Sequence, residues 1–220
     1  MSTVATMLSD FQDHGFTDID QAHFLVYLNH AYMQFCTREP WPFLEKLLTT
    51  TFTASQAQQF TSTTDVKQVL SIINTTKGYA LDPARPETIY KNYVSSLTVP
   101  GIPFYYYEPV VNTAAPMGQQ VHVYPQPIST DAAQMRYIYI PALLAAGGDI
   151  PVLPERFHRV LVFGALWQAY RLEDDPQSGD EYETMFEEGI INARQDLWDD
   201  QYDRPDYVVN IMDDYDYTYY

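Results

Sequence analysis

Apolar side chains recur at helical spacing near the beginning of the chain. They fall at positions 4, 7, 8 and 11, the spacing of an amphipathic helix, and Gly15 is its expected end. A longer helix is predicted from a cap at Asp18 or Asp20 to about Arg38. The prolines that flank Trp41 end this helix, because proline lacks an amide hydrogen and restricts the residue before it.

Helical spacing returns in the last third of the chain. A helix is predicted from Leu153 to about Leu172, and apolar residues cover most of its circumference, as in a helix buried on several sides. The capping-box sequence Ser178–Glu181 predicts a second helix that ends near Trp198. Because the connection between them is short, we expect these two helices to pack antiparallel.

The predicted helices supply most of the expected core. Gly164 and Gly189 either permit a close approach between helices or are ordinary helical glycines, and the sequence leaves both interpretations open. The residues expected in the core are Phe24, Leu28, Trp41, Phe157, Leu161, Gly164, Trp167, Phe186 and Trp198.

Between the helical regions, the pattern changes to that of β-strands. Strands are predicted at residues 47–55, 66–73, 104–107, 119–124 and 134–140, the last three of them antiparallel. Lys77 and Gly78 predict a turn. A short helix is predicted at 86–96, with Ile89, Tyr90 and Tyr93 facing inward.

Together these elements predict an α+β fold. Helices from both ends of the chain form a bundle, which carries a β-rich antiparallel insertion and an extended C-terminal tail. The expected segments are N-terminal helices at 1–45, the insertion at 46–142, a helical hairpin at 143–199 and an acidic, tyrosine-rich tail at 200–220.

The composition adds a strong negative charge to this fold. The 220 residues include 29 acidic and 12 basic side chains, which gives a net charge of −17. Binding of nucleic acid through the bulk surface is therefore excluded, because phosphate neutralisation needs Lys and Arg. No apolar run approaches the ~18 residues of a membrane span. Nineteen tyrosines favour protein interfaces, since tyrosine covers contact area at low entropic cost.

Patterns typical of enzymes and metal sites are missing from the sequence. It contains no glycine-rich nucleotide loop, no G-x-S-x-G elbow and no H-E-x-x-H motif. His23 and His30 lie two helical turns apart, about 10 Å, which is too far to share a metal. The single cysteine, Cys36, predicts a buried structural thiol and a reducing compartment. We expect no enzyme activity, cofactor or metal, although a glycosidase-like carboxylate pair stays open.

The C-terminal tail differs in character from the rest of the chain. Residues 199–220 combine seven aspartates and six tyrosines with a small apolar cluster. We expect this segment to dock on a partner as an added strand, or else to be a solvated tail that aids solubility. The expected protein-interface residues are Tyr207, Val208, Val209, Ile211, Met212, Tyr215, Tyr217, Tyr219 and Tyr220.

The order of these elements resembles the head-to-tail adaptor, or neck, proteins of tailed bacteriophages, a group that includes tail tubular protein A of short-tailed phages. The matching stretches are residues 24–32, 41–43, 121–127, 136–139, 153–170 and 181–198. The sharpest of them is Leu153-Pro154-Glu155-Arg156-Phe157-His158, followed by a buried helix to Tyr170.

This resemblance implies a structural virion protein that is not an enzyme. It implies a ring subunit, typically twelvefold, whose partners are neighbouring copies of itself, the portal protein, and tail, nozzle or tail-completion proteins. DNA would pass through the ring without specific binding, and no membrane is involved. The expected location is the neck or tail vertex of the virion, after synthesis in the host cytoplasm.

Two other classes of function are left open by the residues. The net charge and the spaced carboxylates after Glu173 also suit an acidic DNA-mimic inhibitor of a DNA-binding protein. Exposed tyrosine and tryptophan would suit a small-molecule or carbohydrate-binding β module. Neither alternative explains the order of the elements.

Overall fold

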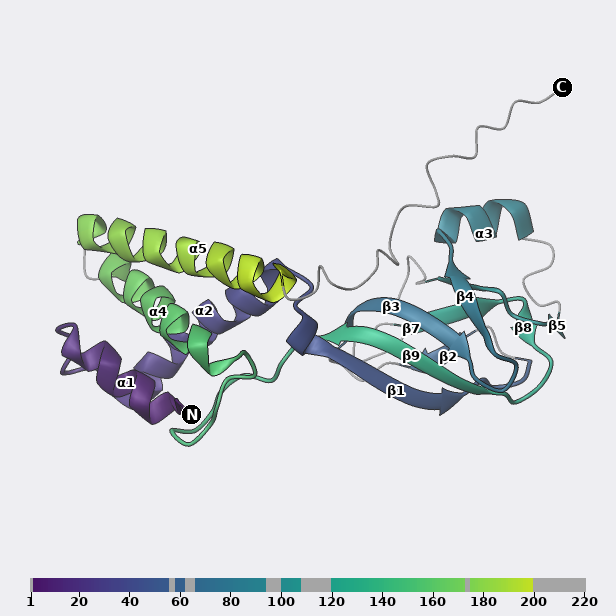
Figure 1. Cartoon of the computed structure of the whole chain (residues 1–220), viewed down its shortest axis with the longest axis horizontal. Coiled ribbons are helices and arrows are strands. Elements are labelled where there is room, and N and C mark those ends of the chain that lie inside the picture. The colour runs from purple at the N-terminus through teal and green to yellow at the C-terminus, as the bar shows by residue number, and fades with distance from the viewer. Residues whose placement is uncertain are drawn as a thin grey trace, which may run out of the picture.

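The computed structural model describes residues 2–55, 58–61, 66–93, 100–107, 120–172 and 175–199. These residues form two lobes that lie end to end along the long axis of the molecule (Figure 1). We call residues 1–44 and 141–199 the helical lobe, and residues 45–140 the sheet lobe. Helices at both ends of the chain and strands between them confirm the predicted α+β fold class.

The helical lobe is built around a central helix, α4. Its α-helices are α1 (Val4–Asp13), α2 (Gln21–Arg38), α4 (His158–Leu172) and α5 (Pro176–Asp199). The 3₁₀-helices η1 (Pro42–Leu44) and η3 (Glu155–Phe157) lead into the sheet lobe and into α4. Helix α4 packs against α1, α2 and α5, so its buried side chains cover most of its circumference.

Side-chain caps fix where the first two helices begin. Thr3 Oγ1 accepts a hydrogen bond from the Thr6 amide at 3.4 Å at the start of α1. Asp20 Oδ1 accepts one from the His23 amide at 2.9 Å, so Asp20, and not Asp18, caps α2.

The capping-box prediction at Ser178–Glu181 is wrong. Helix α5 begins earlier, at Pro176, and Asp175 Oδ1 accepts a hydrogen bond from the Ser178 amide at 3.3 Å. Proline suits the first turn of a helix, where an amide hydrogen would have no carbonyl partner. The proline and the aspartate therefore determine the start of α5.

Two glycines allow the helices of this lobe to approach closely. A Cβ atom at Gly164 would lie 2.6 Å from Ala31 Cβ of α2, and one at Gly189 would lie 2.6 Å from Val160 Cγ1 of α4. Both distances are far below van der Waals contact. Of the two interpretations left open by the sequence, close approach is the one the structure supports.

The sheet lobe contains a curled mixed sheet with the strand order β1-β9-β3-β4-β6-β7-β2. Its strands are β1 (Glu45–Thr51), β2 (Gln58–Thr61), β3 (Val66–Asn74), β4 (Tyr79–Pro83), β6 (Tyr105–Tyr107), β7 (Gln120–Tyr124) and β9 (Ala132–Tyr139). A small second sheet pairs β5 (Pro100–Gly101) with β8 (Gln126–Pro127), and helix α3 (Pro86–Tyr93) lies beside them (Figure 1).

The expectation of a purely antiparallel insertion is wrong. Strand β4 pairs with β6 in parallel, with Asp82 opposite Tyr105, and β5 pairs with β8 in parallel. The three strands expected to be antiparallel do pair in this way, β6 with β7 and β9 with β1 and β3. Strands β2, β4, β5 and β8 had no counterpart in the sequence prediction.

Helix α3 was predicted with three inward-facing residues, and this expectation is wrong for Tyr90. Ile89 is buried, whereas Tyr90 is 37% exposed. The side chain of Tyr93 lies outside the described residues.

Each lobe has its own hydrophobic core. The helical-lobe core holds Phe24, Leu28, Trp41, Phe157, Leu161, Trp167 and Phe186, with Gly164 buried beside them. The sheet-lobe core holds Phe52, Val69, Ile72, Leu81, Val121, Val123 and Met135. The side chain of Trp198, also expected in the core, lies outside the described residues.

Several tyrosines serve these cores, so they are not available to interfaces. Tyr32, Tyr106, Tyr107, Tyr124 and Tyr137 are all buried. The tyrosine excess, which the composition associated with interfaces, therefore belongs in part to the interior.

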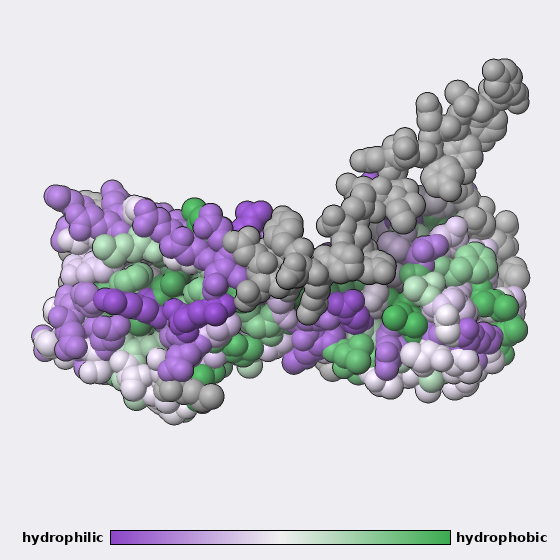
Figure 2. Space-filling view, viewed as in Figure 1, coloured by the Kyte–Doolittle hydropathy of each residue, from purple (hydrophilic) through white to green (hydrophobic). Residues whose placement is uncertain are grey.

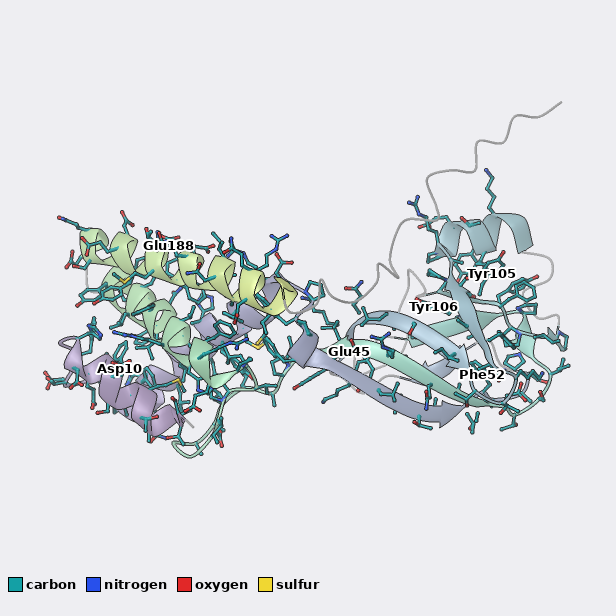
Figure 3. All side chains as sticks on the ribbon, in the orientation of Figure 1. Asp10, Glu45, Phe52, Tyr105, Tyr106 and Glu188 are labelled. Atoms are coloured by element: carbon teal, nitrogen blue, oxygen red, sulfur yellow. The ribbon has the colours of Figure 1, made fainter. Side chains whose placement is uncertain are left out.

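The two lobes are joined where the chain enters β1 and leaves β9. Glu45, at the start of β1, lies at this junction (Figure 3), and its carboxylate accepts a hydrogen bond from Arg136 Nε at 2.8 Å. Lys67 Nζ donates to the carbonyl oxygen of Thr37 at 2.7 Å and so ties β3 to the end of α2. Within the described ranges, no helix is long and apolar enough to cross a membrane.

Candidate assembly surfaces

The predicted docking segment lies outside the described residues. Tyr207, Val208, Val209, Ile211 and Met212, with the tyrosines at 215, 217, 219 and 220, all follow the last residue of α5, Asp199. In the described part of the chain, apolar side chains are exposed on three other surfaces, two on the helical lobe and one on the sheet lobe, and others, such as Leu143 and Leu172, are exposed outside them.

The first surface is the side of α2 that faces away from the bundle. We call it the α2 outer face, and it consists of Ala22, Val26, His30 and Met33, of which Val26 is 65% exposed. Between Gln21 and Thr37 this helix contains no Asp, Glu, Lys or Arg, although the protein carries a net charge of −17. Depletion of charge is typical of the centre of a protein interface.

The second surface is a groove of about 390 Å³ between α4 and α5, which we call the α4–α5 groove. Gly189 brings α5 close to α4 along its floor, and Met185, 44% exposed, stands on its rim. The remaining lining residues are Arg156, Phe157, Arg159, Val160, Phe163, Glu188 and Asn192. Glu188 points outward from α5 (Figure 3).

Four of the five basic side chains of the helical lobe form ion pairs. They join Arg38 to Glu187 at 2.7 Å, Arg156 to Asp196 at 2.6 Å, Arg171 to Glu183 at 3.0 Å and Arg194 to Glu39 at 3.5 Å. These pairs lie at the surface, where each contributes little to stability.

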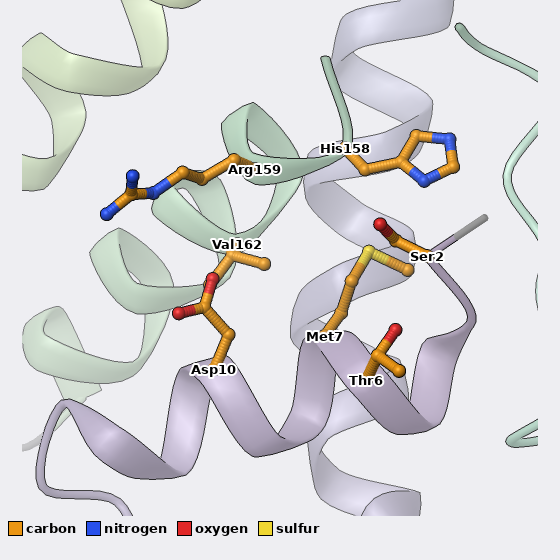
Figure 4. Close-up of a pocket in the computed structure, with 7 residues that line it drawn as sticks. All are labelled: Ser2, Thr6, Met7, Asp10, His158, Arg159 and Val162. Carbon is orange, nitrogen blue, oxygen red and sulfur yellow. The ribbon is translucent and has the colours of Figure 1, made fainter. Parts of the chain in front are cut away.

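Arg159 is the fifth basic side chain and has no acidic partner within ion-pair distance among the described residues. Its guanidinium carbon lies 5.4 Å from the centre of the Phe163 ring. Arg159 also lines a hollow of about 130 Å³ between α1 and α4, opposite Asp10 (Figure 4). A cationic side chain therefore stands at the surface between α1 and α5.

The third surface is the tip of the sheet lobe farthest from the helices. Gly101 of β5 faces Pro127 of β8 in register, and Ile102 and Ile128 are the next residues along the chain after these two strands. Both are about half exposed, as is Phe104. Figure 2 shows apolar surface at this end of the lobe.

Of the titratable groups of α2, one near its start has a structural partner and one near its end is buried. His23 Nδ1 lies 2.8 Å from Asp20 Oδ1, within the cap of α2. Burial raises the pKa of the Cys36 thiol to about 12, which keeps it protonated and unreactive. In the part of the chain that the structure describes, no three His, Cys, Asp or Glu side chains gather as a metal site would require.

Sequence reasoning missed the α2 outer face and the sheet tip. The signal for the first was present, because a stretch of uncharged residues in so acidic a chain is itself informative. No such signal exists for the sheet tip, because the pairing of β5 with β8 brings together residues that are 26 positions apart in the sequence.

Comparison with known families gives one match. The family model described as SU10 adaptor protein matches residues 1–209, which include every element of both lobes. No protein in the comparison with curated proteins matched the chain.

Proposed function

The chain belongs to the SU10 adaptor protein family, a family of bacteriophage structural proteins found in the virion, and from this membership we propose a specific role. The protein is a subunit of the head-to-tail adaptor ring, which docks on the portal, connects it to the tail and surrounds the DNA passage. The observation that carries this proposal is the family match across both lobes. As part of the same proposal, we place the protein near the tail tubular protein A group of adaptors.

The charge of the helical lobe supports a place beside DNA. Its residues, 1–44 and 141–199, include 17 acidic and five basic side chains, and four of those five are already paired. A negative wall does not bind phosphate, so DNA moves past it without being held. The match to an adaptor family gives no support to the alternative of a DNA-mimic inhibitor.

The C-terminal segment is the proposed contact with the portal. It follows directly on α5 and sets Tyr207, Val208, Val209, Ile211 and Met212 within an otherwise acidic tail. An apolar stretch of this kind suits addition as a strand to a partner. The family match ends at residue 209, inside this stretch.

The first test is the copy number per purified virus particle, measured by quantitative mass spectrometry against the major capsid protein. About a dozen copies are expected, because a single ring at one vertex has one copy per symmetry position. Hundreds of copies would indicate a shell or tail-tube protein, and absence from the particle would refute the structural role.

The second test addresses the docking segment. Replacing Val208, Val209, Ile211 and Met212 with serine should abolish co-purification with portal while leaving the melting temperature unchanged. The matched control replaces Asp213, Asp214 and Asp216 with asparagine, which alters charge and keeps the apolar stretch. Equal binding by the serine variant and the parent chain would refute portal docking through this segment.

A further inference from the structure

We infer that the α2 outer face of one copy packs into the α4–α5 groove of the next copy, and that this contact is the side-to-side interface of the ring. The inference rests on the proposed adaptor role and adds the surfaces that neighbouring copies use. It commits to one occupant of the groove, a second copy of this chain.

The two surfaces are separate faces of the helical lobe. Helices α2 and α4 touch at Ala31 and Gly164, where an added Cβ would come within 2.6 Å. Val26 and Arg159 each lie five residues before these contact points. At about 100° per residue, this spacing turns each side chain about 140° away from the contact between the helices. The α2 outer face and the α4–α5 groove are therefore distinct surfaces, and the α2 outer face of one copy does not fill the groove of the same copy.

A ring contact uses two different surfaces of the same chain. Such a contact is heterologous, and repeating it around an axis forms a ring when the rotation closes. The arrangement of α2 relative to α4 and α5 thus fits the ring that the proposed function needs.

The charges of the two surfaces are compatible. The α2 outer face contains no Asp, Glu, Lys or Arg, so it brings no permanently charged side chain into the groove. At the N-terminal end of α2, Asp18 and Asp20 are exposed and opposite in sign to Arg159, which lacks an acidic partner within the described residues. Elsewhere the helical lobe is strongly acidic, and copies would repel one another.

The apolar side chains of the two surfaces also match. Val26, 65% exposed, and Met33 belong to the α2 outer face, while Phe163 and Met185 line the groove. Burying such side chains removes apolar surface from water at about 25 cal/mol per Å². Methionine adapts its shape to a neighbouring surface, which suits the rim of a groove.

Chemical cross-linking tests this contact in the assembled neck. A chain that carries Val26→Cys and Met185→Cys would be incorporated into virus particles and treated with a short bis-maleimide reagent. We expect a ladder of covalent multimers up to the size of the ring, because each copy is linked to the next on both sides. Cys36 does not interfere, since it is buried and its thiol pKa is raised to about 12.

The matched control carries Val26→Cys and Ile191→Cys. Ile191 is 52% exposed on the same helix as Met185, but it lies six residues later and therefore about 120° around α5. This chain should give no ladder. An equal ladder from the control, or none from the Val26–Met185 pair in particles of normal copy number, would overturn the interface and leave the adaptor role intact.

A charge introduced at the interface provides an independent test. Val26→Glu should reduce the copy number in particles at least about tenfold, which corresponds to about 1.4 kcal/mol. Because Val26 is exposed, the isolated chain should keep its melting temperature, and Ile191→Glu should assemble normally. Normal incorporation of the Val26→Glu chain would overturn the inference, whereas absence of the parent chain from particles would refute the adaptor role itself.

Discussion

The helical lobe carries 17 acidic and five basic residues, whereas the sheet lobe carries six of each. The two lobes have separate cores, and they meet where the chain enters β1 and leaves β9. Within the two lobes, the excess of negative charge therefore lies in the helical lobe, which also has the groove and the α2 outer face. The net charge of −17 therefore comes from the helical lobe and the tail, and the sheet lobe contributes no net charge.

The largest expected effect is the destabilisation of the helical lobe when Trp41, a side chain of its core, is removed. Trp41 is completely buried, stacks on Phe35 at 4.9 Å and donates its indole hydrogen to the Phe35 carbonyl at 2.6 Å. Trp41→Ala should lower the free energy of unfolding of the helical lobe by about 3–5 kcal/mol. The two other tryptophans, at 167 and 198, also lie in this lobe, so their fluorescence reports its unfolding in urea. A shift below about 1 kcal/mol would show that Trp41 is not part of the core.

Trp167 provides a contrast within the same lobe. Its indole nitrogen is buried and has no hydrogen-bond partner among the described residues. Trp167→Phe removes this unsatisfied group, so it should cost less than about 1 kcal/mol, well below the cost of Trp41→Ala. Urea unfolding followed by circular dichroism at 222 nm would measure both variants, and equal losses would contradict the difference between the two sites.

An intermediate effect tests the close approach of the helices. Gly164→Ala places a Cβ 2.6 Å from Ala31 Cβ and should destabilise the helical lobe by about 1–3 kcal/mol. Gly148→Ala is the control, because no atom lies within 4 Å of the added methyl group. Thermal melts of the two variants should differ clearly. Similar melting temperatures would mean that α2 can move away from α4 at no cost.

The sheet lobe should show its own dependence on pH. A hydrogen bond from Asn74 Nδ2 at 3.0 Å, together with Lys77 and Ser129, holds the pKa of the Asp131 carboxyl below its usual value. This carboxylate therefore stabilises the fold above its ordinary pKa of about 3.9, and the contribution is lost as the pH falls through the lower folded value. Asp131→Asn should lower stability at neutral pH and flatten the decline between pH 5 and 2, measured by the near-ultraviolet circular dichroism of tyrosine. An unchanged pH profile would contradict this role.

The smallest effect concerns salt. Raising the ionic strength screens repulsion between exposed charges, and the Debye length falls to roughly 3 Å at 1 M. The helical lobe should gain some tenths of a kcal/mol, because its excess of acidic residues outweighs the few ion pairs that salt also weakens. The sheet lobe, with balanced charge, should gain nothing. Hydrogen exchange resolved by lobe would measure both, and equal gains would contradict this uneven distribution of charge.

The helices were predictable because each has a long apolar face with a clear start and end. Helix α2 was predicted within a few residues, since the cap at Asp20 and the prolines around Trp41 are local signals. The start of α5 was wrong because two start signals compete there, and the proline at 176 with Asp175 before it prevails over Ser178. Residues next to the helix ends therefore determine where α2 and α5 begin.

Strand pairing could not be predicted in the same way. The short helix α3 was expected, but its consequence was not: it lies in the connection that makes β4 and β6 parallel. A parallel pair needs such a crossover, whereas adjacent antiparallel strands need only a turn. Strands β5 and β8 have two residues each, too few to show any alternation, and only their tertiary pairing defines them.

Glu45 of β1 stands opposite Ile138 of β9, so the chain enters and leaves the sheet lobe through neighbouring strands. Adjacent strands are about 5 Å apart, a gap that a tight turn can close. The whole of residues 45–139 is thus inserted at a single point of the helical scaffold. During phage evolution, such an insertion can be lengthened, shortened or exchanged for another module without disturbing the scaffold. The helical scaffold can stay the same while the inserted sheet lobe diverges.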